Sequence, residues 1–320
     1  LDGVTGVQTC ALPISFLFIV FWFHLVPPGI DAQTPDRITE AGATDQSPLI
    51  DSLIKVVKLG DRAILVSFGA DAVAAIKAQK GIIVVDTGLS TGLTAKYRQK
   101  IENEFRSHDF AYVIFTHGHA DHIGGHSVFG DAALVSHANA PQETAARSRN
   151  PETARQRIEK IVEYTDSKLV EYEIHSAEWT NAFTQKTRYQ YALNDSGWQT
   201  PFGEPDVTFT DSLQIDGGDI AIEMMYFGSC HSDSDILIYV PELKFLFTGD
   251  LLSRSGRPSL SDNCASDNAK WQRAIAWTEK RMPNIDTILS GHGESITAEN
   301  LEYFIEVMLQ ECRVHPDYTP

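Results

Sequence analysis

The chain has 320 residues, of which 42% are hydrophobic and 22% are charged, enough for one large core or at most two domains. Its formal net charge of −17 argues against nucleic acid as the main partner, although a small anion could still bind at a local positive site. The sequence shows no repeat with a period of 20–50 residues, so a repeat architecture is not expected.

The first 47 residues are expected to lie outside the folded domain. Residues 1–14 include Val4–Ile14, which resembles a translated sequencing adaptor, and they are interpreted as an artefact of sequence assembly. Residues 15–32 carry the apolar run Phe16–Val26, which has the length of a signal-peptide core and is too short for an ordinary bilayer span. A truncated signal peptide is predicted, with export to the periplasm or secretion and no stable membrane insertion; a membrane anchor or a buried N-terminal segment is the alternative. Residues 33–47 are polar and predict a linker.

Residues 48–312 are predicted to form one folded domain, followed by a tail over residues 313–320. Short apolar runs bounded by turns predict strands, and apolar positions at helical spacing predict helices. The predicted strands are Leu53–Leu59, Ala63–Phe68, Ala72–Ala78, Ile82–Val85, Ala111–Phe115, Ala133–Ser136, Val207–Phe209, Leu213–Ile215, Ile220–Tyr226 and Ile236–Val240. The predicted helices are Thr91–Phe105, Pro151–Tyr164, Asn268–Arg281 and Ala298–Gln310.

The stretch Thr116–Gly125 concentrates three histidines and a carboxylate directly after a predicted strand. His117 and His119 are two residues apart, so they point the same way at the end of an extended strand. Asp121 and His122 follow where a helix would begin and can face a second point nearby. Because imidazole and carboxylate groups at close quarters are ligands for zinc-like metals, this stretch predicts a metal site. A polar, histidine-rich loop without a metal is the alternative.

Three further candidate ligands lie next to strand-like segments. His231 precedes the run Ile236–Val240, Asp250 ends the run that begins at Phe245, and His292 follows a short apolar run closed by glycine. Catalytic groups are usually mounted on loops that a rigid sheet holds in place. Each histidine taken alone would more often be an ordinary loop residue, but their shared placement favours one common site.

The order of these residues resembles that of the metallo-β-lactamase-fold hydrolase superfamily. The pattern is His-x-His-x-Asp-His, then His, then Gly-Asp, then Gly-His-Gly, and Gly81–Gly88 is similar to the family's early strand and Asp-Thr-Gly turn. The resemblance covers roughly Leu53 to Glu294. It implies an α/β fold, a four-layer αβ/βα sandwich with two metal ions at one edge.

The resemblance also implies a role for each residue of the motifs. The implied ligands are His117, His119 and His231 for the first metal, Asp121, His122 and His292 for the second, and Asp250 as a bridge between them. An aspartate at the bridging position is similar to the glyoxalase II and lactonase branches. Asp121 is expected to orient the nucleophile or pass its proton to the leaving group. Asp86 is expected to hydrogen-bond loop backbone or a ligand imidazole, or else to be a simple turn-forming residue.

The implied function is that of a dinuclear zinc hydrolase acting on a small molecule. A hydroxide bridging two zinc ions would attack the carbonyl of an ester, thioester, lactone or lactam. An iron-dependent oxidoreductase similar to the sulfur dioxygenases of this fold is a second hypothesis, because imidazole suits iron as well as zinc. A hydrolase of phosphodiesters or sulfate esters is a third hypothesis, and a non-catalytic binding module is a fourth.

The interval between His119 and His231 is 112 positions, longer than the resemblance implies. The excess maps to about residues 140–204 and predicts a helical, aromatic-rich insertion. Its rings could overhang the metals and form a wall or lid for an apolar substrate. Alternatively, they could pack the insertion against the sandwich.

Overall fold

The computed structural model of the chain describes residues 46–147, 149–195, 203–252, 268–293, 295–296, 299–303 and 305–307. These residues belong to the second of two units into which the chain divides, Leu1–Asp45 and Gln46–Pro320. The expected adaptor artefact, the signal peptide and most of the predicted linker lie outside the described residues. Among the described helices, none is both long and apolar enough to cross a bilayer.

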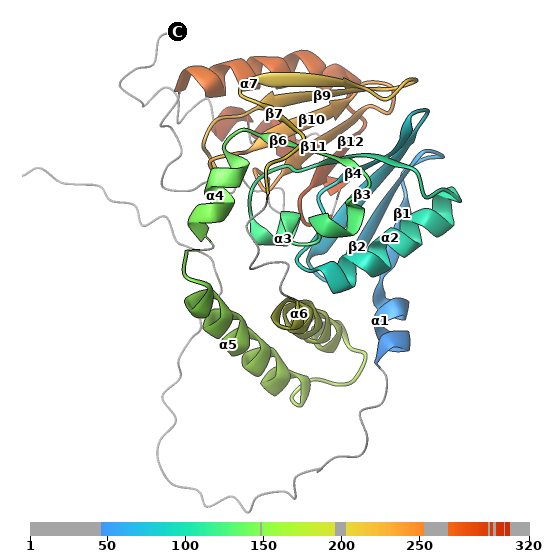
Figure 1. Ribbon diagram of the computed structural model, residues 1–320, viewed down its shortest axis with the longest axis vertical. Coiled ribbons are helices and arrows are strands. Elements are labelled where there is room, and N and C mark those ends of the chain that lie inside the picture. The colour runs from blue at the N-terminus through green and yellow to red at the C-terminus, as the bar shows by residue number, and fades with distance from the viewer. Residues whose placement is uncertain are drawn as a thin grey trace, which may run out of the picture. The chain divides into compact units, whose positions relative to one another are not determined.

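Two mixed β-sheets form the centre of the domain (Figure 1). The first contains, in chain order, β1 (Lys55–Lys58), β2 (Ala63–Phe68), β3 (Asp71–Ala78), β4 (Gly81–Val85), β5 (Phe110–Ile114), β6 (Ala133–His137) and β7 (Val207–Phe209). The second contains, from one edge to the other, β13 (Ser295–Ile296), β12 (Thr287–Ser290), β11 (Phe245–Gly249), β10 (Ile236–Val240), β9 (Ala221–Tyr226) and β8 (Ser212–Asp216). Neighbours from β4 to β7 are parallel, as are β11 and β12, so the carboxyl ends of these strands meet at a common edge within each sheet.

The described helices lie outside the two sheets. They are α1 (Ser47–Leu53), α2 (Thr91–Phe105), α3 (Ala120–Ile123), α4 (Ala140–Arg147), α5 (Pro151–Leu169), α6 (Ala177–Asn194) and α7 (Asn268–Arg281), with 3₁₀ turns η1 (His126–Phe129) and η3 (Met282–Asn284). Helix α2 packs against β2 and β3, whereas α7 packs against β9 of the second sheet (Figure 1). Ser90 caps the start of α2, because its hydroxyl accepts a hydrogen bond from the backbone N–H of Leu93.

Strand alternation sorts the apolar side chains into three layers. In β4, Ile82 and Val84 join the core beneath α2, whereas Ile83 joins the core between the two sheets. In β10, Ile238 joins this central core and Leu237 joins a third core beneath α7. The resulting order of layers confirms the predicted four-layer αβ/βα sandwich.

The structure corrects the predicted start of the domain. The strand predicted over Leu53–Leu59 is shorter, because Leu53 ends helix α1, which the sequence patterns did not indicate. Pro48 lies in the first turn of this helix, where its missing N–H costs nothing. The predicted helix Ala298–Gln310 is helical at residues 299–303 and 305–307, and its remaining residues lie outside the described part of the chain.

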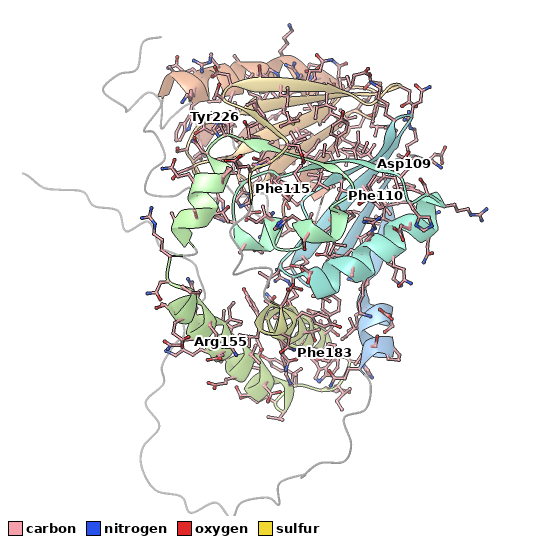
Figure 2. All side chains as sticks on the ribbon, in the orientation of Figure 1. Asp109, Phe110, Phe115, Arg155, Phe183 and Tyr226 are labelled. Carbon is pink, nitrogen blue, oxygen red and sulfur yellow. The ribbon has the colours of Figure 1, made fainter. Side chains whose placement is uncertain are left out.

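The insertion is helical and aromatic-rich, as predicted, and is built from α4, α5 and α6. Helices α5 and α6 lie side by side (Figure 1). The rings of Trp179 and Phe183 stack with centroids 5.0 Å apart, and Phe183, labelled in Figure 2, belongs to the core beneath α2. These two rings therefore pack the insertion against the sandwich. Trp198 and Phe202 lie outside the described residues.

Close backbone approaches hold α6 against the sandwich. A Cβ atom at Gly69 would lie 2.7 Å from Thr184 Oγ1, and one at Gly92 would lie 2.5 Å from the ring of Tyr191. Both distances are below any normal contact, so only glycine permits α6 to sit this close at these two places. The insertion is thereby docked on the turn between β2 and β3 and on the first turn of α2.

Candidate metal centre

Strand ends carry the candidate ligands to one place. His117 and His119 follow β5, and His231 lies in the loop between β9 and β10. Asp250 directly follows β11 and His292 comes two residues after β12. The sheets are joined at this edge, because the backbone N–H of Ile236 donates to the Thr116 carbonyl (2.9 Å). Residues far apart in the sequence therefore meet beside the ends of the parallel strands.

The first cluster contains His117, His119, His231 and Asp250. One nitrogen or oxygen from each lies within 4.8 Å of those of the others. The Nε2 atom of His231 is 3.1 Å from Nδ1 of His119 and 3.5 Å from Oδ2 of Asp250. Three imidazoles and one carboxylate are a donor set that suits zinc.

The second cluster contains Asp121, His122 and His292, whose donor atoms also lie within 4.8 Å of one another. Asp250 Oδ2 is 3.1 Å from His292 Nε2 and 3.5 Å from His122 Nε2. Since the same oxygen is 3.5 Å from His231 of the first cluster, Asp250 lies between the two clusters. The structure thus brings together all seven residues that were predicted as metal ligands.

Asp86, at the end of β4, contacts both loop backbone and an imidazole. Its Oδ1 accepts from the Thr116 backbone N–H and its Oδ2 from the Thr116 hydroxyl, both at 2.8 Å. Oδ2 is also 2.9 Å from Nδ1 of His122. Asp86 has a positive φ of 59°, so the turn after β4 is held in a conformation that few residues other than glycine adopt. These contacts lock the loop of the motif and the orientation of the His122 ring.

The carboxylates and imidazoles of the two clusters shift one another's pKa values. Burial lowers the pKa of His292, but the hydrogen bond to Asp250 and the charge of Asp250 outweigh burial and raise it. Burial raises the pKa of Asp121, but the charges of His122 and His292 outweigh burial and lower this pKa to about 2. Burial and the neighbouring His119 lower the pKa of His231 to about 4, so its ring is neutral at pH 7. The Asp121 carboxylate is therefore ionised and the His231 imidazole uncharged, which are the forms that bind metal.

Buried atoms without hydrogen-bond partners mark where a cation would be held. Among the described residues, His117 Nε2, His122 Nε2 and Asp250 Oδ1 are fully buried and have no partner. An orphaned buried polar group costs about 1–3 kcal/mol, so three such atoms in one cluster require an explanation. Coordination to metal ions would satisfy the two imidazole nitrogens, and the donor set fits zinc.

Sequence reasoning missed two charged residues that the insertion brings to this edge. Glu143 of α4 is buried, and its Oε1 lies 3.4 Å from Nε2 of His119. Arg188 of α6 forms a buried ion pair with Asp71, and its charge contributes to the low pKa of Asp121. No sequence motif contains either residue, because each contact joins segments that are separate in sequence.

The aromatic ring next to Arg188 also lies close enough to the second cluster to respond to it. Burial is the main cause that raises the pKa of Tyr189, and the negative charge of Asp121 raises it further. Helix α6 therefore lies near the carboxylate of Asp121.

The metallo-beta-lactamase superfamily model matches residues 72–292 of the chain. The type 2 metallo-beta-lactamase of Bacillus cereus is 22% identical over 219 residues, which are 68% of this chain and 65% of that protein. The type 2 enzyme of Bacteroides fragilis is 24% identical over 106 residues, 33% of this chain and 43% of that protein. The chain therefore matches about two thirds of the length of the Bacillus cereus relative, and less of the other.

Solved structures show the same fold. A metallo-beta-lactamase from Pontibacter korlensis superposes with a TM-score of 0.54 at 17% identity, covering 80% of this chain and 99% of that one. A stereoselective inverting sec-alkylsulfatase from a Pseudomonas species gives a TM-score of 0.54 at 17% identity, covering 82% of this chain and 42% of that one. A Pseudomonas aeruginosa metallo-beta-lactamase in a mono-zinc form gives 0.52 at 16% identity, covering 81% and 96%.

Proposed function

Because the chain belongs to the metallo-beta-lactamase superfamily, we propose that it is a metal-dependent hydrolase that holds two zinc ions. The observation that carries this proposal is the position of Asp250. Its carboxylate lies between two clusters of imidazoles, 3.5 Å from His231 and 3.1 Å from His292. A carboxylate placed between two sets of imidazole donors is suited to bridging two cations.

In this proposal His117, His119 and His231 hold the first ion. Asp121, His122 and His292 would hold the second, and Asp250 would contribute to both. Bound zinc would supply a nucleophile at neutral pH and polarise the oxygen of the attacked group. Iron is the alternative metal, because the same imidazoles suit it.

The residues of the chain contribute orientation and proton handling. Asp86 fixes the His122 ring and the loop that carries the motif. The side chain of Asp121 is about one third exposed, which makes it accessible from solvent. With a pKa of about 2 it is ionised at neutral pH, so its carboxylate can accept a hydrogen bond from the nucleophile and orient it.

The proposed substrate is a small molecule with an ester, thioester, lactone or lactam carbonyl. The insertion would limit what reaches Asp121, because α6 lies near this residue. Export to the periplasm or the medium also belongs to the proposal and depends on the apolar run within residues 15–32.

Metal analysis combined with a substrate screen tests the proposal. The purified protein, loaded with zinc, would be assayed against β-lactams, lactones, thioesters, phosphodiesters and alkyl sulfates, and oxygen uptake would be measured after loading with iron. We expect about two zinc ions per chain, as in two-metal hydrolases, and turnover of a carbonyl substrate. Oxygen uptake without hydrolysis would instead support the oxidoreductase.

The variant Asp250→Ala tests whether Asp250 bridges the two proposed zinc ions. It should lose at least one zinc ion and most turnover, because the remaining histidines have no shared anion between them. Asp216→Ala is the matched control, since Asp216 is an exposed carboxylate at the end of β8 that pairs with Lys80. Full zinc content and activity in Asp250→Ala would exclude Asp250 as the bridge.

A further inference from the structure

Four of the five imidazoles of the metal centre use one nitrogen for the cluster and the other for an oxygen outside it. In three of them Nδ1 faces outward and Nε2 faces the cluster. The outward contacts are His117 to the Thr116 hydroxyl (3.1 Å), His122 to Asp86 Oδ2 (2.9 Å) and His292 to the Ala70 carbonyl (2.7 Å). Such contacts fix which nitrogen carries the proton and how the ring is turned.

His119 is turned the other way. Its Nδ1 faces the cluster, 3.1 Å from Nε2 of His231. Its Nε2 therefore points outward, and Glu143 Oε1 lies 3.4 Å from that atom. The outward nitrogen of His119 therefore faces a carboxylate of helix α4.

Glu143 is itself held in place. It is 8% exposed, and its Oε2 accepts a hydrogen bond from the Ser234 hydroxyl at 2.6 Å. The same hydroxyl accepts from the backbone N–H of Gly118 at 2.9 Å. A Cβ atom at Gly118 would lie 2.9 Å from Glu143 Oε2, so glycine beside His119 leaves room for the carboxylate. The contacts form a closed chain from the loop backbone through Ser234 to Glu143.

We propose that Glu143 is a positioning residue for the metal centre, which accepts the Nε2 proton of His119 and thereby keeps Nδ1 free to bind the first metal ion. This inference rests on the proposed metal-binding function. The physical reason is that a carboxylate behind a ligand imidazole fixes its tautomer and makes the other nitrogen a stronger donor. The first helix of the insertion then strengthens metal binding without touching the metal.

The test measures zinc affinity rather than turnover. Wild-type protein, Glu143→Ala and Glu143→Gln would compete with a chromophoric chelator for zinc, and each would also be loaded with cobalt(II) for absorption spectra. We expect Glu143→Ala to bind the tighter zinc ion about 10- to 100-fold more weakly and to show a changed cobalt spectrum. Glu143→Gln keeps an acceptor oxygen without the charge, so it should recover part of the affinity.

A matched control separates this role from the loss of any glutamate. Glu102 of α2 also lies beside an imidazole, with Oε1 3.2 Å from His108 Nδ1, but this contact lies outside the metal clusters. Glu102→Gln should leave zinc affinity and the cobalt spectrum unchanged. Thermal unfolding of the metal-free variants checks their folding, and Glu143→Gln, the most conservative change, decides the matter if Glu143→Ala does not fold.

The outcomes distinguish the two proposals. If the wild-type protein binds zinc and both Glu143 variants bind it equally well with an unchanged cobalt spectrum, the positioning role is overturned. If the wild-type protein binds no divalent cation, the proposed function falls and the role of Glu143 falls with it. A graded loss from wild type through Glu143→Gln to Glu143→Ala, with Glu102→Gln unaffected, supports the inference.

Discussion

The ion pair between Arg188 of α6 and Asp71 of β3 joins the insertion to the sandwich, and its removal should destabilise the protein strongly. Asp71 Oδ1 lies 2.5 Å from Arg188 Nη2 and 2.7 Å from Nε, and the two side chains are 0% and 3% exposed. The other carboxylate oxygen accepts from the Tyr97 hydroxyl at 3.0 Å. Burial opposes the charge on Arg188, but the field of Asp71 outweighs burial and raises the pKa of the guanidinium.

The size of the effect follows from this burial. The variant Arg188→Met keeps most of the aliphatic volume but leaves the Asp71 charge buried, with the Tyr97 hydroxyl as a remaining donor. Breaking a buried pair in this way costs about 3–5 kcal/mol, and no discount for solvent screening applies because both side chains are shielded from water. The pair as a whole is not expected to contribute that much, since replacing both partners removes the stranded charge.

Urea unfolding of the metal-free protein, followed by far-ultraviolet circular dichroism, measures this cost. Arg188→Met should lose about 3–5 kcal/mol, and the double variant Arg188→Met with Asp71→Asn should lose less than the sum of the single variants. Lys80→Met is the control, because Lys80 and Asp216 form an ion pair whose side chains are mostly exposed, and such a pair contributes little to stability. A loss in Arg188→Met no larger than that of Lys80→Met would refute the reasoning.

Two further variants test other features of the described domain. Because Trp179 stacks on Phe183 and packs against the core beneath α2, Trp179→Ala should lower the free energy of unfolding by about 2–4 kcal/mol and leave the preference between large and small substrates unchanged. A selective loss of bulky substrates with unchanged stability would show that this ring lines the site instead. Burial lowers the pKa of His137 to about 4, so the folded protein resists a proton that the unfolded chain accepts near pH 6.5. Its contribution to stability is complete above pH 6.5 and is lost as the pH falls toward 4, by about 3 kcal/mol in all. The variant His137→Phe keeps a ring against Tyr226 and should flatten this decline. The measurement is the free energy of unfolding of both proteins at pH 7 and at pH 4.5. An equal decline in both proteins would contradict the shift.

The parts of the structure that follow local rules could be predicted from the sequence. Short apolar runs such as Ile82–Val85 and Ile236–Val240 predicted the strands of both sheets, and the close spacing from His117 to His122 identified the edge where candidate ligands gather. The resemblance to a known family then brought in His231, Asp250 and His292, which no local pattern connects. The ligand roles themselves stay predictions until metal is measured.

Helix α6 shows why other parts could not be predicted. Its buried face includes Thr184, Thr187 and Arg188, so hydrophobic periodicity does not indicate which face of the helix packs against the sandwich. Arg188 and Asp71 are 117 positions apart, and an isolated aspartate close to a glycine reads as a turn residue. No sequence pattern indicated Glu143 either, because its proposed role depends on a contact with His119 that only the folded chain creates.

The docking of the insertion limits how freely this enzyme scaffold can be trimmed or exchanged. Excising the helices to obtain a compact sandwich would remove the charge partner of Asp71, next to Ala70, whose carbonyl orients His292. Grafting the helices onto another sandwich would need an acid at the start of its third strand and glycines at the positions of Gly69 and Gly92. The insertion and the metal-bearing edge therefore depend on each other structurally. Chimeras with a recombination boundary between them should fold poorly.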